Sequence, residues 1–506
     1  MKTTDSGQRA YGRILKSSSL VGGAEGINML IGMVRIKFMA VLLGPTGVGL
    51  LGLFQSIQTM SKTISTCGIN NSGVREIAQA NGTSDPQAIA RVAITLRRLC
   101  WILGGLGALL LFTLAPYVGE LTFGDSTHTQ SIRLLSIAVL LMSISGGQMA
   151  LLQGMRRIAD MACANVLSAF FGSILAVYCY WQLGVDGIVP GMVALAAVTC
   201  LFSLYFSRQV RLEPIRLSWR ASFVCGAGLL SLGLAFMWNG LVSGGVEYAT
   251  RWLIIEEIDL AAVGIFMAAY RLSGMFLNFI LGAMAADFYP SLAALSGDHA
   301  KMRILVNQQI EVGLLIALPG LMATLLFSPW IIQVFYTAEF AQAVPMLQWF
   351  VIGCLGRVIN WPMGLVVVAK GKAKVFALLQ TFFQGIYLGF IFIGLKLWGL
   401  AGVAYGFAGF YLIHIFAVYF VAKWIIGFSW ERTVWHLISK SLLLALLSLI
   451  VSRSLPLGWA TAIGGMVTLV ISILCLRSLA GLLERSHRIN RFICKIPYVG
   501  ELIVGR

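Results

Sequence analysis

Fourteen long apolar segments, separated by short polar loops, constrain this chain more than any other feature of its sequence. A helix that crosses a bilayer core needs about 20 mostly apolar residues. The segments cover residues 17–43, 48–69, 95–117, 132–153, 162–183, 188–207, 222–246, 260–288, 309–335, 345–369, 375–397, 400–422, 437–455 and 458–477. Of the 506 residues, 58% are hydrophobic and only 11% are charged. The sequence therefore predicts an all-α polytopic membrane protein with about fourteen transmembrane helices.

The first two segments contain polar side chains where a membrane helix can least accommodate them. In the first, Glu25, Asn28 and Arg35 follow one another at intervals of three and seven residues, which places them on one helical face. The second segment repeats this pattern with Gln55, Gln58, Lys62 and Ser65. Charged groups at membrane depth are costly and usually face a protein interior or a watery cavity. We therefore expect a hydrated, partly cationic cavity between helices.

Further polar residues lie inside later segments. Glu247 and Arg251 are near the end of the seventh, Arg271, Asn278 and Asp287 belong to the eighth, and Arg357 and Asn360 belong to the tenth. Arg251 is either a cavity cation or an anchor at the membrane interface. The predicted substrate-binding residues are Arg35, Lys62, Arg251, Arg271, Arg357, Asn28, Gln55, Gln58, Asn278 and Asn360. The candidates for coupling to H⁺ or Na⁺ are Glu25, Glu247 and Asp287.

The basic residues predict the orientation of the chain. The formal net charge is +17, and most of the cations lie in the loops on the side of the N-terminus, while the opposite loops contain several acids. This is the positive-inside distribution, which predicts two cytoplasmic termini and argues against a nucleic-acid partner. The basic segment 1–16 is expected to be a cytoplasmic lead-in and not a removed signal. The tail after Arg477 is also basic, and it either contacts anionic lipids or is a solvated tail.

Two classes of site are disfavoured by the sequence. The nine cysteines form no Cys-x-x-Cys pair and the five histidines are far apart, so neither a disulfide framework, a metal site nor a bound cofactor is expected. The loops opposite the N-terminal side are short, the longest covering about residues 118–131. They offer little room for a catalytic site, and we expect no enzyme.

An internal repeat divides the chain. Val48-Gly49 recurs later in the chain as Val263-Gly264. Gln153-Gly154 recurs as Lys370-Gly371, and the number of residues between these two copies, the offset, is slightly larger. A third match, at the same offset as the first, pairs Gly184, Gly187 and Gly191 with Gly399, Gly402 and Gly406. A unit of six spans gives a parallel repeat. We expect an N-lobe at 1–215, a C-lobe at 216–424, a cleft between these lobes, and two extra spans with a basic tail at 425–506.

Several short motifs resemble the Wzx-type polysaccharide flippases of the MOP exporter superfamily. The motifs are Leu42-Leu43-Gly44-Pro45, Gly47-Val48-Gly49-Leu50 with Gln55, Val263-Gly264-Ile265-Phe266, and Asp287-Phe288-Tyr289-Pro290-Ser291-Leu292. The resemblance implies a bacterial inner-membrane transporter that moves sugar repeat units linked to undecaprenyl diphosphate from the cytoplasmic to the periplasmic leaflet. It also implies membrane lipids, a polymerase and chain-length machinery as partners. Arg and Lys in a cavity of low dielectric would stabilise the diphosphate.

Two other functions remain open from the sequence. A multidrug or cation exporter of the same superfamily would need acids or aromatic residues in its cavity, whereas intramembrane cations outnumber acids here. A membrane-embedded glycan polymerase would need catalytic groups at the periplasmic face, where the loops are short. Alternating access through a cationic central cavity is the mechanism that the sequence favours.

Overall fold

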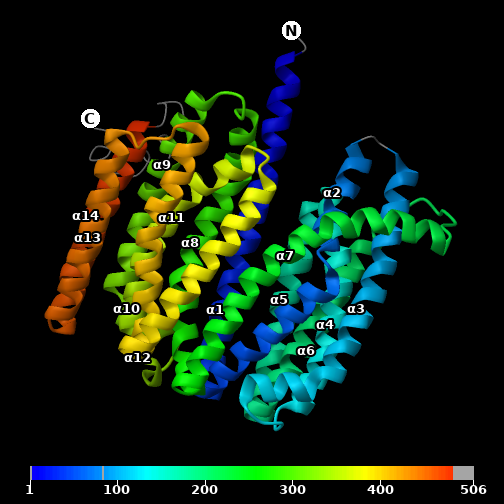
Figure 1. The fold of residues 1–506 in the computed structure, drawn as a ribbon, viewed down its shortest axis with the longest axis horizontal. Helices are drawn as coiled ribbons and strands as arrows, with labels where there is room; N and C mark the ends of the chain where they lie inside the picture. Colours follow the sequence, from blue (N-terminus) through cyan, green and yellow to red (C-terminus); the bar gives the residue numbers. More distant parts are fainter. Residues whose placement is uncertain (1–2, 83–84, 483–506) are drawn as a thin grey trace. The chain divides into compact units, whose positions relative to one another are not determined.

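The computed structural model describes residues 3–82 and 85–482, with side chains from Gly23 onward except at six positions, 232, 235, 283, 286, 287 and 373 (Figure 1). This part of the chain consists of α-helices and two short 3₁₀ helices and contains no strand. The elements are α1 (Thr3–Thr66), α2 (Ile69–Gly82), α3 (Pro86–Phe123), α4 (Thr129–Gly154), α5 (Ile158–Leu183), η1 (Gly184–Gly187), α6 (Ile188–Arg208), α7 (Trp219–Glu257), α8 (Leu260–Ala294), α9 (His299–Leu326), α10 (Ser328–Phe335), η2 (Ala338–Phe340), α11 (Ala343–Ala369), α12 (Ala373–Ile426), α13 (Arg432–Ser454) and α14 (Leu457–Leu482).

The protein is a multi-pass helical membrane protein. Ten helices in the described part are long and apolar enough to cross a membrane, and the count rises to eleven with a bent pair in α7, Trp219–Ser231 and Phe236–Glu257. Three of the ten, at 23–66, 158–208 and 374–426, are long enough for two crossings each. The predicted all-helical class is confirmed, and the number fourteen stays a prediction.

The chain divides into two compact units, residues 1–264 and 265–506. The first unit contains α1 to α7 and the beginning of α8, and the second contains the rest of α8 and everything after it. The division between an N-lobe and a C-lobe after residue 215, expected from the repeat, stays a prediction.

The chain reverses at a glycine within both units. Gly184 follows α5 with φ +57°, and Gly399 interrupts α12 with φ +58°. Such positive φ values suit glycine, which has no Cβ. A Cβ added at Gly187 would collide with the backbone of Cys179, and one added at Gly402 would collide with that of Gly394. Because these glycines are the ones paired in the third match of the repeat, the two helical hairpins are equivalent, and α12 consists of two antiparallel helices.

The predicted pairing of Gly154 with Gly371 is wrong. In the structure the counterpart of Gly371 is Arg156, and with this pairing the second match has the same separation along the chain as the other two. After α4, Arg156 has φ +55°, and after α11 Gly371 has φ +68°. The next amide closes each turn in the same way, from Arg157 to the carbonyl of Leu152 and from Lys372 to the carbonyl of Val367. The sequence alignment paired one glycine with another, whereas the left-handed position is occupied by arginine in the first unit.

The remaining match, Gly49 with Gly264, forms a reciprocal contact within the first unit. A Cβ added at Gly49 would collide with the carbonyl oxygen of Leu260, and one added at Gly264 would collide with that of Pro45. Pro45 and Leu260 each precede the glycine of their own helix by four residues. Two helices can therefore cross here with their backbones in contact.

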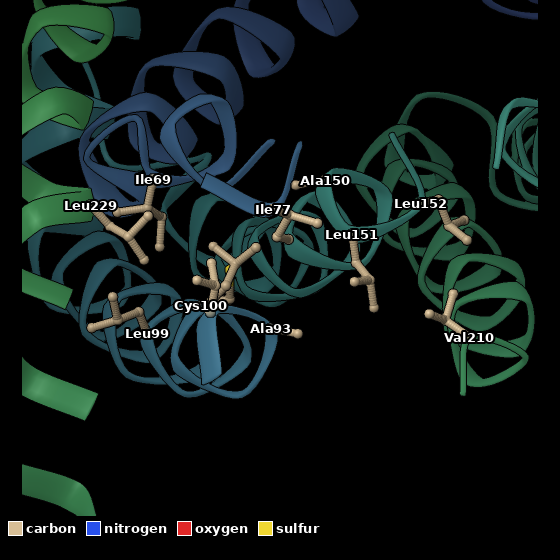
Figure 2. Packing of buried hydrophobic residues seen from close by; sticks show 12 residues of the cluster. Ile69, Ile77, Ala93, Leu99, Cys100, Ala150, Leu151, Leu152, Val210 and Leu229 are labelled. Carbon is tan, nitrogen blue, oxygen red and sulfur yellow. The ribbon is translucent and has the colours of Figure 1, made fainter. Parts of the chain in front are cut away.

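A cluster of buried apolar side chains connects α2, α3, α4 and α7 in the first unit (Figure 2). Ile69 and Ile77 come from α2, Leu99 from α3, Leu151 from α4 and Leu229 from α7. The sequence predicted only a loop at the position of α2. The helix was not predicted because its apolar face is too short to cross a membrane. Since α2 follows α1 directly, its packing in this cluster also positions the end of α1.

Hydrogen bonds connect both ends of α13 to the helices α9 and α11 of the same unit. At the first end, Asn307 of α9 donates to the carbonyl of Ser429 and accepts from the amide of Glu431, both at 3.0 Å. At the other end, Gln348 of α11 donates to Ser452 at 2.8 Å and accepts from Arg453 at 3.3 Å. Buried carboxamides thus hold α13, the first of the two C-terminal helices predicted to lie outside the repeat.

Candidate functional site

A cavity of about 310 Å³, lined by both polar and apolar side chains, lies within the first unit. Its wall is formed by α1, α4, α5 and α6 and contains Gln55, Gln58, Lys62, Met142, Ser145, Gly146, Met149, Asn165, Met192, Leu195, Ala196 and Thr199. The predicted stripe of α1 therefore reaches a cavity, since the glutamines and the lysine line it together.

Lys62 is the one charged side chain among the described residues that line this cavity. It lies on α1 one helical turn after Gln58, which is itself buried, and no carboxylate of the described chain forms an ion pair with it. A single cation surrounded by uncharged hydrogen-bonding groups attracts an anion or a hydroxyl-rich group.

Three polar wall residues were not predicted as site residues: Ser145, Asn165 and Thr199. Each is an isolated polar residue in an apolar helix, and the repeat would have pointed to one of them, because Ser145 is the counterpart of the predicted Asn360. The sequence did not show which helices would pack around the stripe of α1.

The second unit contains a different polar cluster, centred on Arg357 of α11. Its guanidinium donates to Oδ1 of Asn278 at 3.2 Å and lies 6.0 Å from the ring centroid of Tyr411. Nearby, the amide of Asn360 contacts Nδ1 of His414 at 3.2 Å. The structure thus brings three predicted residues, Arg357, Asn278 and Asn360, into one cluster, to which it adds Tyr411 and His414.

The two clusters occupy equivalent places in the repeat. At the offset that separates Gly184 from Gly399, the wall residues Met192, Leu195, Ala196 and Thr199 correspond to Phe407, Phe410, Tyr411 and His414. These larger rings contact one another, with centroids 4.7 Å apart for Phe407 and Tyr411 and 5.0 Å apart for Phe410 and His414. Small and flexible side chains leave a cavity in the first unit, whereas rings fill the same positions in the second.

Arg251 is not in the wall of the cavity but connects two helices of the first unit. Its buried guanidinium donates to the hydroxyl of Ser56 and to the carbonyl of Gly52 on α1, and it forms an ion pair with Glu247 at 3.4 Å. Glu247 is half exposed. This geometry favours a structural role for the pair, and the role of Arg251 as a cavity cation or an interfacial anchor stays a prediction.

The other predicted residues are dispersed. On α1, Glu25 is exposed, whereas Asn28 and Arg35 are half-buried. Arg271, on α8, is half-buried and close to Tyr336, whose pKa is raised by burial to about 12 while the charge of Arg271 opposes that shift. Asp287 belongs to α8, and its side chain lies outside the described part. No group of three or more metal-binding side chains is found among the described residues.

Comparison with known proteins agrees with this architecture. The "Lipid III flippase" of Escherichia coli (strain K12) is 24% identical over 380 residues, which cover 73% of this chain and 88% of that protein. A multidrug resistance MATE family transporter of the MOP superfamily, in its inward-facing conformation, has a TM-score of 0.68 at 17% identity, covering 81% of this chain and 98% of its own.

The lipid II flippase MurJ, in an inward closed conformation, has a TM-score of 0.67 at 13% identity and covers 91% of this chain and 99% of its own. Both structural likenesses establish the fold. The family model described as "Polysaccharide biosynthesis protein" matches residues 38–345, more than half of the chain, and the chain therefore belongs to that family.

Proposed function

We propose that this chain is a flippase for lipid-linked oligosaccharides. Its substrate would be a sugar repeat unit on undecaprenyl diphosphate, moved from the cytoplasmic to the periplasmic leaflet of a bacterial inner membrane by alternating access. The family assignment and the flippase relative support this proposal. Both termini would be cytoplasmic, and a polymerase with its chain-length machinery would act on the product.

The observation that carries the proposal is the composition of the cavity wall in the first unit. One lysine, two glutamines, one asparagine and two hydroxyl groups line the cavity, with no carboxylate among the described wall residues. Sugar hydroxyls both donate and accept hydrogen bonds, as carboxamides and hydroxyls do. An anionic, hydroxylated head group therefore fits the wall.

A cation exporter is disfavoured by the same wall, although the MATE transporter has a similar fold. A cationic drug in this cavity would face the ammonium group of Lys62 without an acid to compensate it, and like charges in a medium of low dielectric repel strongly. Transport, and not catalysis, is the activity that this arrangement supports.

Energy for transport would come from the membrane potential or from a coupled ion. A potential that is negative inside favours outward movement of an anion by about 2.3 kcal/mol per charge per 100 mV. Counter-movement of H⁺ or Na⁺ would involve Glu25, Glu247 or Asp287, of which Glu247 already has a cationic partner.

The test is complementation of a flippase-deficient strain by Arg35→Ala, Lys62→Ala and Arg271→Ala variants. We expect glycan display to fall in each, because each variant loses a cation that would bind the head group, while the amount of protein in the membrane stays near wild type. Removing a charge from a membrane helix lowers the cost of insertion. Immunoblots of membranes accompany the glycan measurement. Full glycan display by all three variants would contradict the role of these cations.

A further inference from the structure

The charge of the cavity in the first unit limits what it can hold. Lys62 contributes one positive charge, and the other polar groups of the described wall are uncharged: Gln55, Gln58, Ser145, Asn165 and Thr199. Burying an uncompensated charge is costly, so a ligand in this cavity matches the wall best with one negative charge.

A diphosphate matches this wall poorly. It has at least two negative charges, and proteins usually bind it with the planar fork of arginine or with several backbone amides. The described wall contains no arginine, and Lys62 supplies a single point charge. A carboxylate has one negative charge and can accept hydrogen bonds from a lysine and a neighbouring carboxamide together.

The remaining wall matches a sugar ring. A volume of about 310 Å³ is at the lower end of the range for small-ligand sites. The carboxamides and hydroxyls can bind ring hydroxyls, while Met142, Met149 and Met192 offer flexible apolar surfaces to the C–H faces of a ring.

We propose that the cavity in the first unit recognises a sugar residue with one carboxylate, a uronic acid, within the translocated head group, and that Lys62 pairs with this carboxylate. This inference rests on the proposed flippase function. It assigns the diphosphate to cations outside this cavity and makes Lys62 a specificity-determining residue.

The experiment compares two lipid-linked substrates in proteoliposomes that contain the full-length protein. Both are disaccharides on undecaprenyl diphosphate, and they differ only in a terminal glucuronosyl or glucosyl residue. Wild-type protein is expected to translocate the glucuronosyl substrate faster. In Lys62→Gln the ratio of the two rates should fall about tenfold, the factor that corresponds to one charge-assisted hydrogen bond.

Two variants control this measurement. Lys62→Arg retains the charge and should retain most of the preference, and Lys440→Gln makes the same chemical change at an exposed position of α13 and should not alter the ratio. Lys62→Met, with a side chain of similar length, replaces the glutamine variant if that variant is not recovered in membranes.

Each outcome decides between the two proposals. If Lys62→Gln slows both substrates equally, Lys62 acts on the diphosphate or on the fold, and the inference is wrong while the flippase function stands. The same holds if wild-type protein translocates both substrates at one rate. If wild-type protein translocates neither substrate, the flippase function fails, and the inference falls with it.

Discussion

At the scale of residues, helical periodicity predicted half of the candidate site. Because residues three and four apart share a face, the spacing of Gln55, Gln58 and Lys62 was sufficient to place them together, and all three line the cavity. Periodicity does not show which helix faces that stripe, so Asn165 and Thr199 could not be found in this way. Periodicity also did not show that Arg251 contacts α1, because a cation in a span can bind another helix as well as a ligand.

The connection between Arg251 and α1 leads to a prediction about stability. Arg251→Ala removes two hydrogen bonds between α7 and α1, to the hydroxyl of Ser56 and to the carbonyl of Gly52, which also accepts from Ser56. A hydrogen bond from a charged group typically contributes about 1.5–3 kcal/mol. We expect a lower melting temperature of the purified protein in detergent. Arg208→Ala, at an exposed position near the end of α6, is the matched control and should melt like wild type. Equal melting of both variants would show that the contact contributes nothing.

At the scale of elements, the recurrence of glycines predicted that the segments around Gly184 and Gly399 are equivalent, and the chain reverses at both. The sequence comparison paired the wrong residue with Gly371, because Arg156 adopts a left-handed conformation although it is not a glycine. Residue type determines backbone conformation only in part. Two positions can therefore be structurally equivalent in a repeat even when their residue types differ.

The crossing of Gly49 and Gly264 gives a prediction at this scale. Gly49→Ala would push a Cβ into the carbonyl oxygen of Leu260, so the two helices must separate. Overpacking of this kind typically costs about 1–3 kcal/mol. We expect less folded protein and a lower melting temperature, measured by fluorescence-detected gel filtration after heating.

Gly105→Ala on α3 is the control for this substitution, because a Cβ there meets nothing within 4 Å. Alanine is favoured over glycine inside a helix by roughly 0.5–1 kcal/mol, so this variant should be as stable as wild type or more so. If Gly49→Ala is no less stable than Gly105→Ala, the crossing tolerates separation and is not a close contact.

At the scale of the whole molecule, composition and length were sufficient to predict the helical membrane class, and the repeat predicted equivalent hairpins. Neither showed how α13 is held, because its attachment depends on isolated carboxamides. Gln348 and Asn307 have no periodic partners in the sequence, and each binds groups that are distant along the chain.

These two carboxamides should keep α13 in place. In the double variant Gln348→Leu and Asn307→Leu, the hydrogen bonds at both ends of α13 are lost, at about 1 kcal/mol for each bond. We expect faster hydrogen exchange in α13 and at residues 427–431, measured by mass spectrometry on the full-length protein. Ser439→Ala is the control, since its exposed hydroxyl bonds to the carbonyl of Trp435 in its own helix. Unchanged exchange in the double variant would show that these carboxamide hydrogen bonds do not keep α13 in place.

The reciprocal contact of Gly49 and Gly264 has a consequence for the origin of the chain. In a symmetric dimer, residue i of one subunit contacts residue j of the other while j contacts i, so the interface complements itself. Gly49 meets Leu260 as Gly264 meets Pro45, which is this isologous geometry within a single polypeptide. A mutation at either glycine therefore acts on one shared contact, and the two positions are constrained as a pair, as an interface between two identical ancestral subunits would have been.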